Sequence, residues 1–385
     1  MKIQSIIICS SGYPTPADPI APFISQIAHA FSRIGIKVSV ISPQSIIKHW
    51  IRGNELRPKR WMDSYESGKE PIIIYQPYVF SFGDRFEKLN ALMRDRAVYK
   101  ALKANKLQAD IFYGHFWHHG YSLYKYAKEK GKPLFVVSGE SKISLHNLKK
   151  PQALSEFKEY LSGLICVSSK NLEESAAAGL ITKKENSIVI PNAIDNDLFH
   201  IMNKTELRKK YNIDKDSFIV AFTGWYDENK GVHRVSSAIK NINDHQIKVF
   251  FIGDIRDKGG KMPDCEGILH TGILPHEKIA EYLNMADVFV LPTLAEGCNN
   301  AIIEAMACGL PIISSNRSFN WDVLNEENSI LIDPMNVDEI AKAIESLRDD
   351  KVKRDSMSQA ALKTAAELTI DKRAERIISF IESKI

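Results

Sequence analysis

Short apolar runs alternate along the whole chain with amphipathic stretches. The runs Ile3–Cys9 and Phe218–Thr223 predict buried strands of a parallel sheet, because each is nearly continuous and bounded by polar loops. The stretch Ile24–Arg33 predicts a helix that ends at Gly35. This order of strand and helix predicts an α/β fold in which helices cover parallel sheets. Further strands are expected at Lys37–Ser42, Ile72–Tyr75, Ile111–Tyr113, Leu134–Val137, Leu164–Val167, Lys248–Ile252, Val288–Leu291 and Ile312–Ser314.

The turn-rich segment Pro191–Asp195 separates one strand–helix series from the next and predicts a hinge. We therefore expect two Rossmann-like, doubly wound domains, 1–193 and 194–366, for which 385 residues provide ample core. Segment 367–385 is expected to add a closing helix, Lys372–Ser383, with one apolar face. Neither series contains a Gly-x-Gly-x-x-Gly turn, so the sequence gives little support to NAD binding.

Charge is divided unevenly between the two halves. Residues 1–200 hold 27 Lys and Arg against 18 Asp and Glu, whereas the remainder holds 24 against 29. A basic half attracts nucleic acid, anionic lipid or a phosphorylated acceptor. No zinc spacing or other nucleic-acid motif accompanies it, which favours the last two. The five cysteines form no metal-ligand spacing and are expected to be reduced, as in a cytoplasmic protein.

The segment 285–316 carries the most specific chemistry. Its strand, Val288–Leu291, leads into a polar loop with Glu296, and a helix is expected over Asn300–Cys308, capped by Gly309. Glu304 shares a helical face with Asn300, so two carboxylates and the N–H groups of a helix start are expected to converge. Carboxylates bind hydroxyls and a helix N-terminus binds phosphate, which together suit a nucleotide sugar. The alternative is a buried helix with an incidental Glu at its start.

The pattern Glu-Gly-x6-Glu-Ala-x-Ala-x-Gly-x-Pro, which begins at Glu296, resembles the retaining glycosyltransferases of family 4. The resemblance implies the two-domain GT-B fold, with an acceptor-side first domain, a donor-side second domain and a last helix that returns to the first. It implies that Glu296 holds a hydroxyl of the donor sugar and Glu304 the ribose. Donor contacts are implied for the loop residues Gly297, Cys298, Asn299 and Asn300.

Lys230 is the second residue expected to contact the donor. It follows the strand Phe218–Thr223, where a cation can neutralise a departing diphosphate. The family usually has Gly-Arg early in this loop, whereas this chain has Gly224–Trp225. Either Lys230 acts with one basic partner fewer, or Arg256 or Arg317 substitutes. The alternative for Lys230 is a solvated surface side chain.

The resemblance also implies donor contacts from the first domain. His115 ends the strand that begins at Ile111, and its alternative is packing against Trp117. Ser138 stands where the family has a histidine, and Glu140 lies just beyond it, so both are expected at the cleft by position. In the second domain, Gly253 and Ile273 match the family's nucleotide-base pocket, in which contacts come mostly from the backbone.

Asp195–Asn196–Asp197 has the Asp-x-Asp form by which another glycosyltransferase fold binds a divalent metal. Because it directly follows the hinge, we interpret it as helix-capping and turn residues instead. No metal or other cofactor is expected, with Lys230 and helix N-termini in its place.

Residues 46–61 mix Trp50 and Trp61 with five Lys or Arg, which predicts either a membrane-interface segment or a solvated loop. Together these features predict a cytoplasmic hexosyltransferase, peripheral on the inner face of the membrane. It would move a hexose from a UDP- or GDP-sugar to a glycan or lipid-linked acceptor in cell-envelope or capsule synthesis. Two alternatives stay open: an epimerase or phosphorylase of the same fold, and a non-catalytic partner of a polysaccharide assembly complex.

Overall fold

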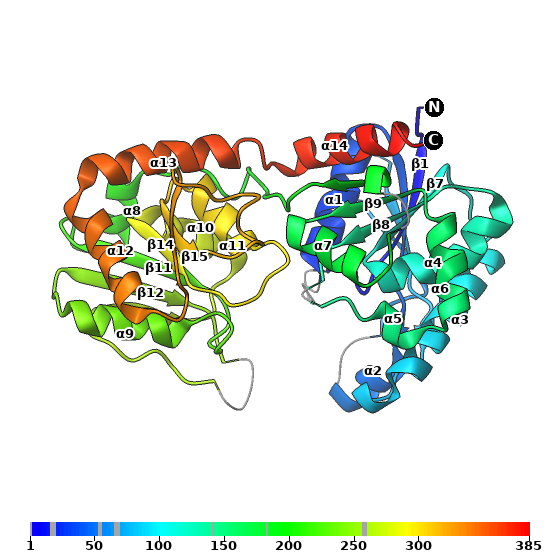
Figure 1. The fold of residues 1–385 in the computed structure, drawn as a ribbon, viewed down its shortest axis with the longest axis horizontal. Coiled ribbons are helices and arrows are strands. Elements are labelled where there is room, and N and C mark those ends of the chain that lie inside the picture. Colours follow the sequence, from blue (N-terminus) through cyan, green and yellow to red (C-terminus); the bar gives the residue numbers. More distant parts are fainter. Residues whose placement is uncertain are drawn as a thin grey trace. The chain divides into compact units, whose positions relative to one another are not determined.

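The chain forms two compact units, each built on one main parallel sheet (Figure 1). The computed structural model describes residues 2–15, 21–52, 56–64, 70–140, 142–181, 184–255 and 260–385. Unit 1 comprises Met1–Ile190 and Ile370–Ile385, and unit 2 comprises Pro191–Thr369. These limits lie about three residues from the expected 193/194 and 366/367 boundaries.

Unit 1 has an eight-stranded sheet in the order β10-β9-β8-β7-β1-β2-β5-β4. All neighbouring pairs are parallel except β4 with β5. The strands are β1 Ser5–Cys9, β2 Lys37–Ile41, β4 Arg60–Asp63, β5 Ile72–Tyr75, β7 Ile111–His115, β8 Leu134–Ser138, β9 Gly163–Cys166 and β10 Ser187–Val189, and β3 Gln44–Ser45 pairs separately with β6 Tyr78–Val79.

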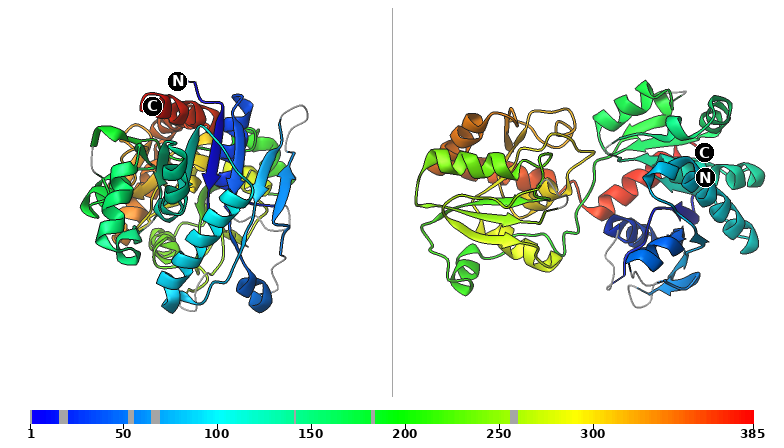
Figure 2. Two further views of the ribbon diagram at one scale, coloured as in Figure 1. Left: turned by 90° about the vertical axis from the view of Figure 1, so that its right-hand side faces the viewer. Right: turned by 90° about the horizontal axis from the view of Figure 1, so that it is seen from below.

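The helices of unit 1 are α1 Pro22–Arg33, α2 Ile46–Arg52, α3 Glu87–Ala104, α4 Trp117–Lys130, α5 Leu145–Leu148, α6 Pro151–Tyr160, α7 Ser169–Ala177 and α14 Ile370–Glu382, with 3-10 turns η1 Asp84–Phe86 and η2 Lys184–Asn186. Helix α14 packs beside α1, although the two are far apart in the sequence, and α4 packs against α3 and α6 (Figures 1 and 2). Arg33 of α1 donates two hydrogen bonds to Asp371 of α14, at 2.9 and 2.6 Å, which fixes their register.

Unit 2 has a six-stranded, fully parallel sheet in the order β13-β12-β11-β14-β15-β16. Its strands are β11 Phe218–Thr223, β12 Ile247–Ile252, β13 Ile268–Gly272, β14 Val288–Leu291, β15 Ile312–Ser315 and β16 Ser329–Ile332. Its helices are α8 Lys204–Lys210, α9 Val232–Ile242, α10 His276–Met285, α11 Asn300–Ala307, α12 Val337–Asp349 and α13 Lys351–Ala365.

The sheet of unit 2 is covered by helices on both sides, as expected for central strands β11 and β14 that are apolar at every position except Thr223 at the end of β11. Helices α9 and α12 pack together, and α10 and α11 pack on β11 and β14. The expected C-terminal cap of α11 is confirmed, since Gly309 has φ +77° and its N–H donates to Met306 O at 3.0 Å.

Two sequence expectations need correction. Trp61 belongs to strand β4, where its Nε1–H donates to Gln76 at 2.7 Å and its ring packs edge-on against Tyr13, so it is not a solvated loop residue. Asp195 and Asp197 form a turn, in which Asp197 N donates to Asp195 Oδ1 at 3.0 Å. They cap no helix, because the next one, α8, is capped by Asn203.

Candidate functional site

The carboxyl ends of β11 and β12 form a tight glycine corner in unit 2. Gly224 has φ +158° and Gly253 has φ +153°, and the Gly224 N–H donates to Ile252 O at 2.9 Å. A Cβ on Gly253 would lie 1.9 Å from Gly224 O, so no larger residue fits without moving a strand end. Ligands of open parallel sheets bind at such carboxyl ends.

Lys230 and Glu296 form a direct ion pair beside this corner. The Lys230 ammonium contacts Glu296 Oε1, which also accepts a hydrogen bond from the Thr293 hydroxyl at 2.9 Å. The two paired side chains are 17% and 16% exposed, so the pair is largely withdrawn from solvent. Asp227 positions Lys230 by accepting its backbone N–H at 2.8 Å. The structure thus joins two residues that the sequence predicts on separate motifs.

Hydrogen bonds connect the loop that carries Lys230 to the loop that carries Glu296. Leu294 N donates to Asn229 O at 2.8 Å, and Asn229 Nδ2 donates to Ala295 O at 3.1 Å. Arg234, on α9, is buried and donates from Nη2 to Glu228 O at 2.9 Å and to Pro292 O at 3.0 Å. Since Pro292 directly follows β14, Arg234 ties the Lys230 loop to the Glu296 loop.

Arg234 was not predicted from the sequence. The signal that could have found it is an Arg between Val232 and Val235, on the apolar face of an amphipathic helix. A buried Arg needs several acceptors, and loop carbonyls supply them here. Arg234 is therefore a positioning residue for both loops.

The N-terminus of α11 follows the Glu296 loop directly. Asn299 caps the helix by accepting the Ala301 N–H at 3.0 Å, while its own buried Nδ2 finds no partner within the described residues. Asn192, which the sequence places only in the hinge, donates to Cys298 O at 3.2 Å and to Asn300 Oδ1 at 2.8 Å. Gly297 is buried in the same loop. Loop residues 297–300 therefore surround a helix start, where anions bind favourably.

Glu304 has a different partner from Glu296. His276, at the start of α10, lies with Nε2 3.6 Å from Glu304 Oε1. The Glu304 carboxylate raises the pKa of His276 above its ordinary value of 6.5. His276 was not predicted from the sequence, because no local pattern links it to Glu304 28 positions later. Burial and, to a smaller extent, the Glu304 carboxylate raise the pKa of Cys308 to about 12, so that thiol stays protonated.

Three further predicted residues lie on the surface of unit 2. Trp225 is 43% exposed directly after Gly224, and Ile273 is exposed just beyond β13. Arg317, one of two expected substitutes for the missing Arg, is exposed after β15. The other, Arg256, lies outside the described residues.

In unit 1, His115 is buried at the end of β7. It is 5% exposed and its ring stacks on Phe23, with ring centres 5.0 Å apart. Burial and, to a smaller extent, the positive charge of nearby Arg373 lower the pKa of His115 to about 3, so the ring is neutral. The next residue, Phe116, has φ +119°, which an L-residue adopts only under strain held by surrounding packing. The expected packing partner, Trp117, instead contacts Phe157.

Ser138 and Glu140 form one network around Trp117. Ser138 Oγ donates to Glu140 at 3.1 Å and accepts the Trp117 indole N–H at 3.2 Å. Glu140 also accepts the backbone N–H groups of Trp117, at 2.8 Å, and Gly139, at 3.0 Å. Burial raises the pKa of Glu140 despite these donors. The hydroxyl at position 138 therefore already bonds to the protein at the position where the family has a histidine.

Across the described ranges, no group of three or more His, Cys, Asp or Glu side chains is arranged to hold a metal ion. None of the helices in those ranges combines the length and the apolar composition that spanning a bilayer requires.

Residues 203–364 match the family profile described as glycosyl transferases group 1. That range holds all six strands of unit 2 and the residues Lys230, Glu296 and Glu304. A Bacillus subtilis protein, TuaC, assigned by name to teichuronic acid biosynthesis as a glycosyltransferase, is 25% identical over 91% of this chain and 90% of its own length. An Escherichia coli enzyme named UDP-Gal:alpha-D-GlcNAc-diphosphoundecaprenol alpha-1,3-galactosyltransferase is 29% identical over 56% of this chain and 58% of its own length.

The fold is shared with solved structures. HepE of Anabaena, solved in complex with UDP, aligns with a TM-score of 0.70 over 99% of this chain and 100% of its own, at 16% identity. Such a likeness shows the fold, and the predicted GT-B architecture is confirmed. The chain is a glycosyltransferase with the GT-B fold, and its residues 203–364 are similar to the glycosyl transferases group 1 family.

Proposed function

We propose that the chain is a retaining hexosyltransferase of family 4, which moves a hexose from a nucleoside-diphosphate sugar to a glycan or lipid-linked acceptor. The observation that carries this proposal is the Lys230–Glu296 pair. The pair lies on two hydrogen-bonded loops at the carboxyl ends of parallel strands, next to the start of α11. A cation for a diphosphate and a carboxylate for a sugar hydroxyl are therefore held side by side.

The pair suggests how donor binding and chemistry are linked. Without donor, the Lys230 ammonium is neutralised by Glu296. A bound diphosphate brings more negative charge than a carboxylate and competes for Lys230, which frees Glu296 to accept a hydroxyl of the sugar. Because charge grows on the diphosphate as the glycosidic bond breaks, Lys230 binds the transition state more tightly than the ground state.

Glu304 is proposed to accept hydrogen bonds from the ribose hydroxyls, with His276 as its neighbour. The sequence shows no evident nucleophile for a double displacement, so we expect the acceptor to attack from the face on which the diphosphate leaves. Retention of configuration follows from that geometry. Lys230 and the amide groups at the start of α11 replace a divalent metal in this proposal.

The donor nucleotide is proposed to be UDP, with GDP as the alternative. Support comes from the HepE structure, which was solved with UDP, and from the Escherichia coli relative, whose name specifies UDP-Gal. That name also specifies a diphosphoundecaprenol-linked acceptor, and the Bacillus subtilis relative is assigned to teichuronic acid synthesis. These names support a role in cell-envelope polysaccharide synthesis.

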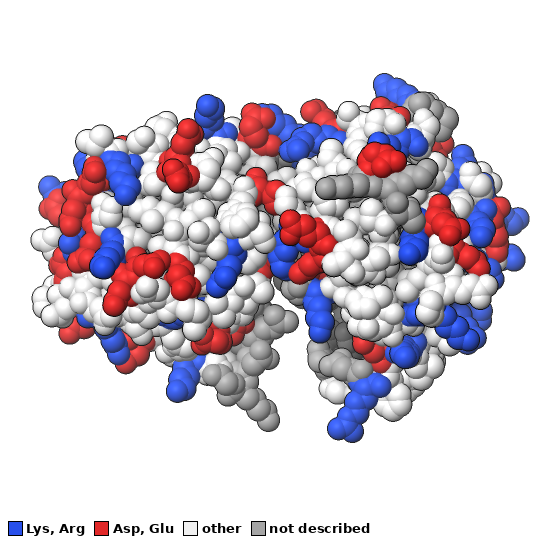
Figure 3. Space-filling model, viewed as in Figure 1, with Lys and Arg blue, Asp and Glu red and all other residues white. Residues whose placement is uncertain are grey.

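A cytoplasmic location with peripheral membrane contact is part of the proposal. Trp50 and Ile51 of α2 are 69% and 77% exposed. Figure 3 shows Lys and Arg side chains on the face of unit 1, interspersed with Asp and Glu, and the first half of the chain is basic in sum. Exposed aromatic and basic side chains together favour an anionic membrane surface.

A thermal-shift series tests the proposal, with UDP, GDP, ADP and their common sugar derivatives, each with and without magnesium. At 100 times the dissociation constant, binding stabilises the protein by about 2.7 kcal/mol. We expect a magnesium-independent rise in the unfolding midpoint with one nucleotide class. No rise with any nucleotide would contradict the donor assignment. Release of free sugar or an epimer without acceptor would favour a hydrolytic or epimerising enzyme.

A further inference from the structure

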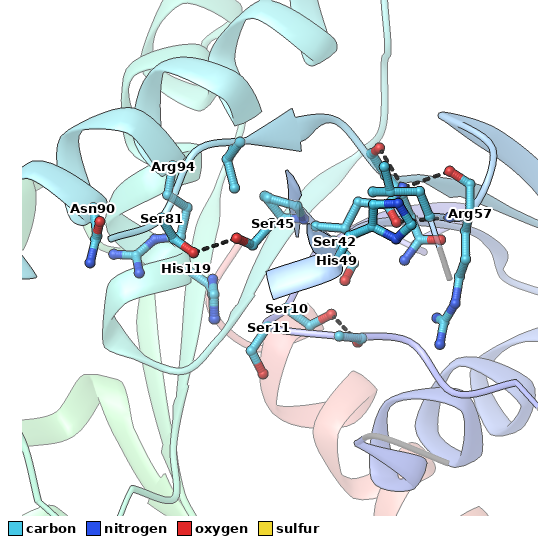
Figure 4. A pocket seen from close by; sticks show the side chains of 16 residues that line it. Ser10, Ser11, Ser42, Ser45, His49, Arg57, Ser81, Asn90, Arg94 and His119 are labelled. Atoms are coloured by element: carbon cyan, nitrogen blue, oxygen red, sulfur yellow. Dashed lines mark hydrogen bonds between the residues drawn. The ribbon is translucent and has the colours of Figure 1, made fainter. Parts of the chain in front are cut away.

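Unit 1 contains a polar pocket of about 280 Å³ at the carboxyl ends of β1, β2 and β5. Ser10 and Gly12 follow β1, Ser42 follows β2 and Gln76 follows β5. Figure 4 shows Arg94 and His119 on one side of this pocket and Arg57 on the other. The pocket therefore occupies the edge of a parallel sheet at which ligands ordinarily bind.

Several pocket residues have polar atoms that the described part of the chain leaves without a hydrogen-bond partner. These atoms are Nε and Nη2 of Arg94, Nδ1 of His119 and Oγ of Ser42. His119 is 6% exposed and Ser42 1% exposed, so these two side chains are largely withdrawn from bulk solvent. Buried polar groups in native proteins are nearly always paired, so unpaired ones gathered at one pocket are available to bind a polar ligand.

The charge of the pocket selects an anion. Its lining includes Arg57 and Arg94 and, among the described residues, neither Asp nor Glu. Asp95, the neighbour of Arg94 on α3, is engaged with Lys149 and with the Ser122 hydroxyl at 2.6 Å. Burial and the positive charge of Arg94 lower the pKa of His119, which leaves it a neutral hydrogen-bonding group. The Nε and Nη2 edge of a guanidinium is the fork that binds two oxygens of one phosphate.

A second, larger cavity of about 510 Å³ shares Val79 with the polar pocket. Its walls are mostly apolar, and Lys59, Arg96 and Lys100 also line it. Helix α3 lines both spaces, with Asn90 and Arg94 in the polar pocket and other side chains in the apolar groove. The apolar wall residues include Tyr75, Pro77, Tyr78, Phe80, Met93 and Ala97.

A polar pocket for an oxyanion next to an apolar groove matches one kind of molecule, an amphiphile with a phosphate head. We propose that the polar pocket binds the phosphate group of a lipid-linked acceptor and that the apolar groove holds the adjoining part of its hydrocarbon chain. This assignment rests on the proposed transferase function and specifies its acceptor. A sugar carboxylate would satisfy the polar pocket but would leave the groove without a use.

Binding of farnesyl diphosphate, inorganic pyrophosphate, farnesol and D-glucuronate tests the assignment. Each is measured with UDP at saturation, so that diphosphate binding in unit 2 is blocked. We expect farnesyl diphosphate to bind at least about tenfold more tightly than pyrophosphate, because its chain buries apolar surface. Arg94→Gln should weaken both diphosphates by about tenfold, whereas Lys88→Gln, a matched change at an exposed position of α3, should leave both unchanged within about twofold.

A groove-filling variant separates the two spaces. Ala97→Trp should weaken farnesyl diphosphate by about tenfold and leave pyrophosphate within about twofold, which also shows that the variant is folded. Equal effects of Arg94→Gln and Lys88→Gln would overturn the assignment, as would glucuronate binding more tightly than either diphosphate. UDP binding, measured in parallel without the lipid, separates failure of this assignment from failure of the proposed function.

Discussion

In unit 2 the charged side chains beside the strand ends form an ion pair or bond to neighbouring loops, whereas in unit 1 two nitrogens of the Arg94 guanidinium have no partner within the described residues. Lys230, Glu296 and Arg234 are engaged with neighbouring loops, and Arg94 and His119 face a pocket with unpaired nitrogens. A donor that binds in unit 2 must therefore displace the existing contact between Lys230 and Glu296. A phosphate that binds in the unit 1 pocket displaces no such protein contact of Arg94 Nε and Nη2. The loops of unit 2 are ordered before the donor binds, which lowers the entropy cost of binding, whereas unit 1 retains hydrogen-bond donors that a ligand can use.

Glu296→Ala should have the largest effect in unit 2. We expect the rate of sugar transfer to fall by about 10²- to 10³-fold, because a group that orients the sugar is lost. UDP binding should be retained, since Lys230 no longer has to leave a carboxylate to meet a phosphate. Radiolabelled transfer and calorimetric UDP titration measure the two effects, with Glu326→Ala at an exposed position as the control. Near-normal turnover would remove Glu296 from the mechanism.

Two matched arginine substitutions sharpen the comparison through stability. Arg234→Gln should lower the free energy of unfolding by about 2 to 4 kcal/mol. The substitution removes the buried guanidinium and so leaves the loop carbonyls of Glu228 and Pro292 without their donor. Arg94→Gln should change it by less than about 0.5 kcal/mol, because the two nitrogens named above bond to nothing described. Urea unfolding of both variants decides the point. Equal losses would show that unit 1 is as tightly bonded as unit 2.

Lys230→Ala should weaken UDP binding by about 10- to 100-fold, because the cation nearest the proposed diphosphate is lost. The same variant should leave pyrophosphate binding to unit 1 unaffected once UDP is saturating. Lys261→Ala, at an exposed position of unit 2, is the charge-matched control. If the two lysine variants bind UDP equally well, the loop contributes no diphosphate contact.

The smallest expected effect concerns His276 and pH. Glu304 raises the folded-state pKa of His276, so protonation favours the folded protein. This stabilisation is fully present below the unfolded pKa of about 6.5 and is lost as the pH rises through the higher folded value. Because His276 is 46% exposed, the effect should stay below about 1 kcal/mol. The free energies of unfolding of wild type and His276→Gln are compared in urea at pH 6 and pH 9, with the exposed His245→Gln as reference. If wild type and His276→Gln differ by the same amount at both pH values, the pairing of His276 with Glu304 is contradicted.

Much of the fold could be predicted because buried parallel strands appear in the sequence as continuous apolar runs. The runs Ile72–Tyr75, Phe218–Thr223 and Val288–Leu291 were predicted with the bounds that the structure gives them, since strands buried on both faces are apolar throughout. Strand β4 was missed, because an edge strand with the sequence Arg-Trp-Met-Asp has no such run.

The candidate site was predictable only as far as its local motifs extend. Lys230 and Glu296 each stand in a recognisable loop, but their pairing depends on hydrogen bonds between loops 66 residues apart. His276 and Asn192 meet Glu304 and the α11 start only in three dimensions. The roles of all these residues in binding stay predictions until the variants above are measured.

Unit 1 is assembled from the beginning of the chain and from residues 370–385, with all of unit 2 in between. In α14 the residues Ile377 and Ile381 are fully buried, so residues 370–385 form part of the hydrophobic core of unit 1. On a ribosome, the first 190 residues emerge long before their last helix exists, while unit 2 is continuous and can fold as soon as it leaves the tunnel. Unit 1 should therefore mature after unit 2, because its core is complete only once α14 has been synthesised.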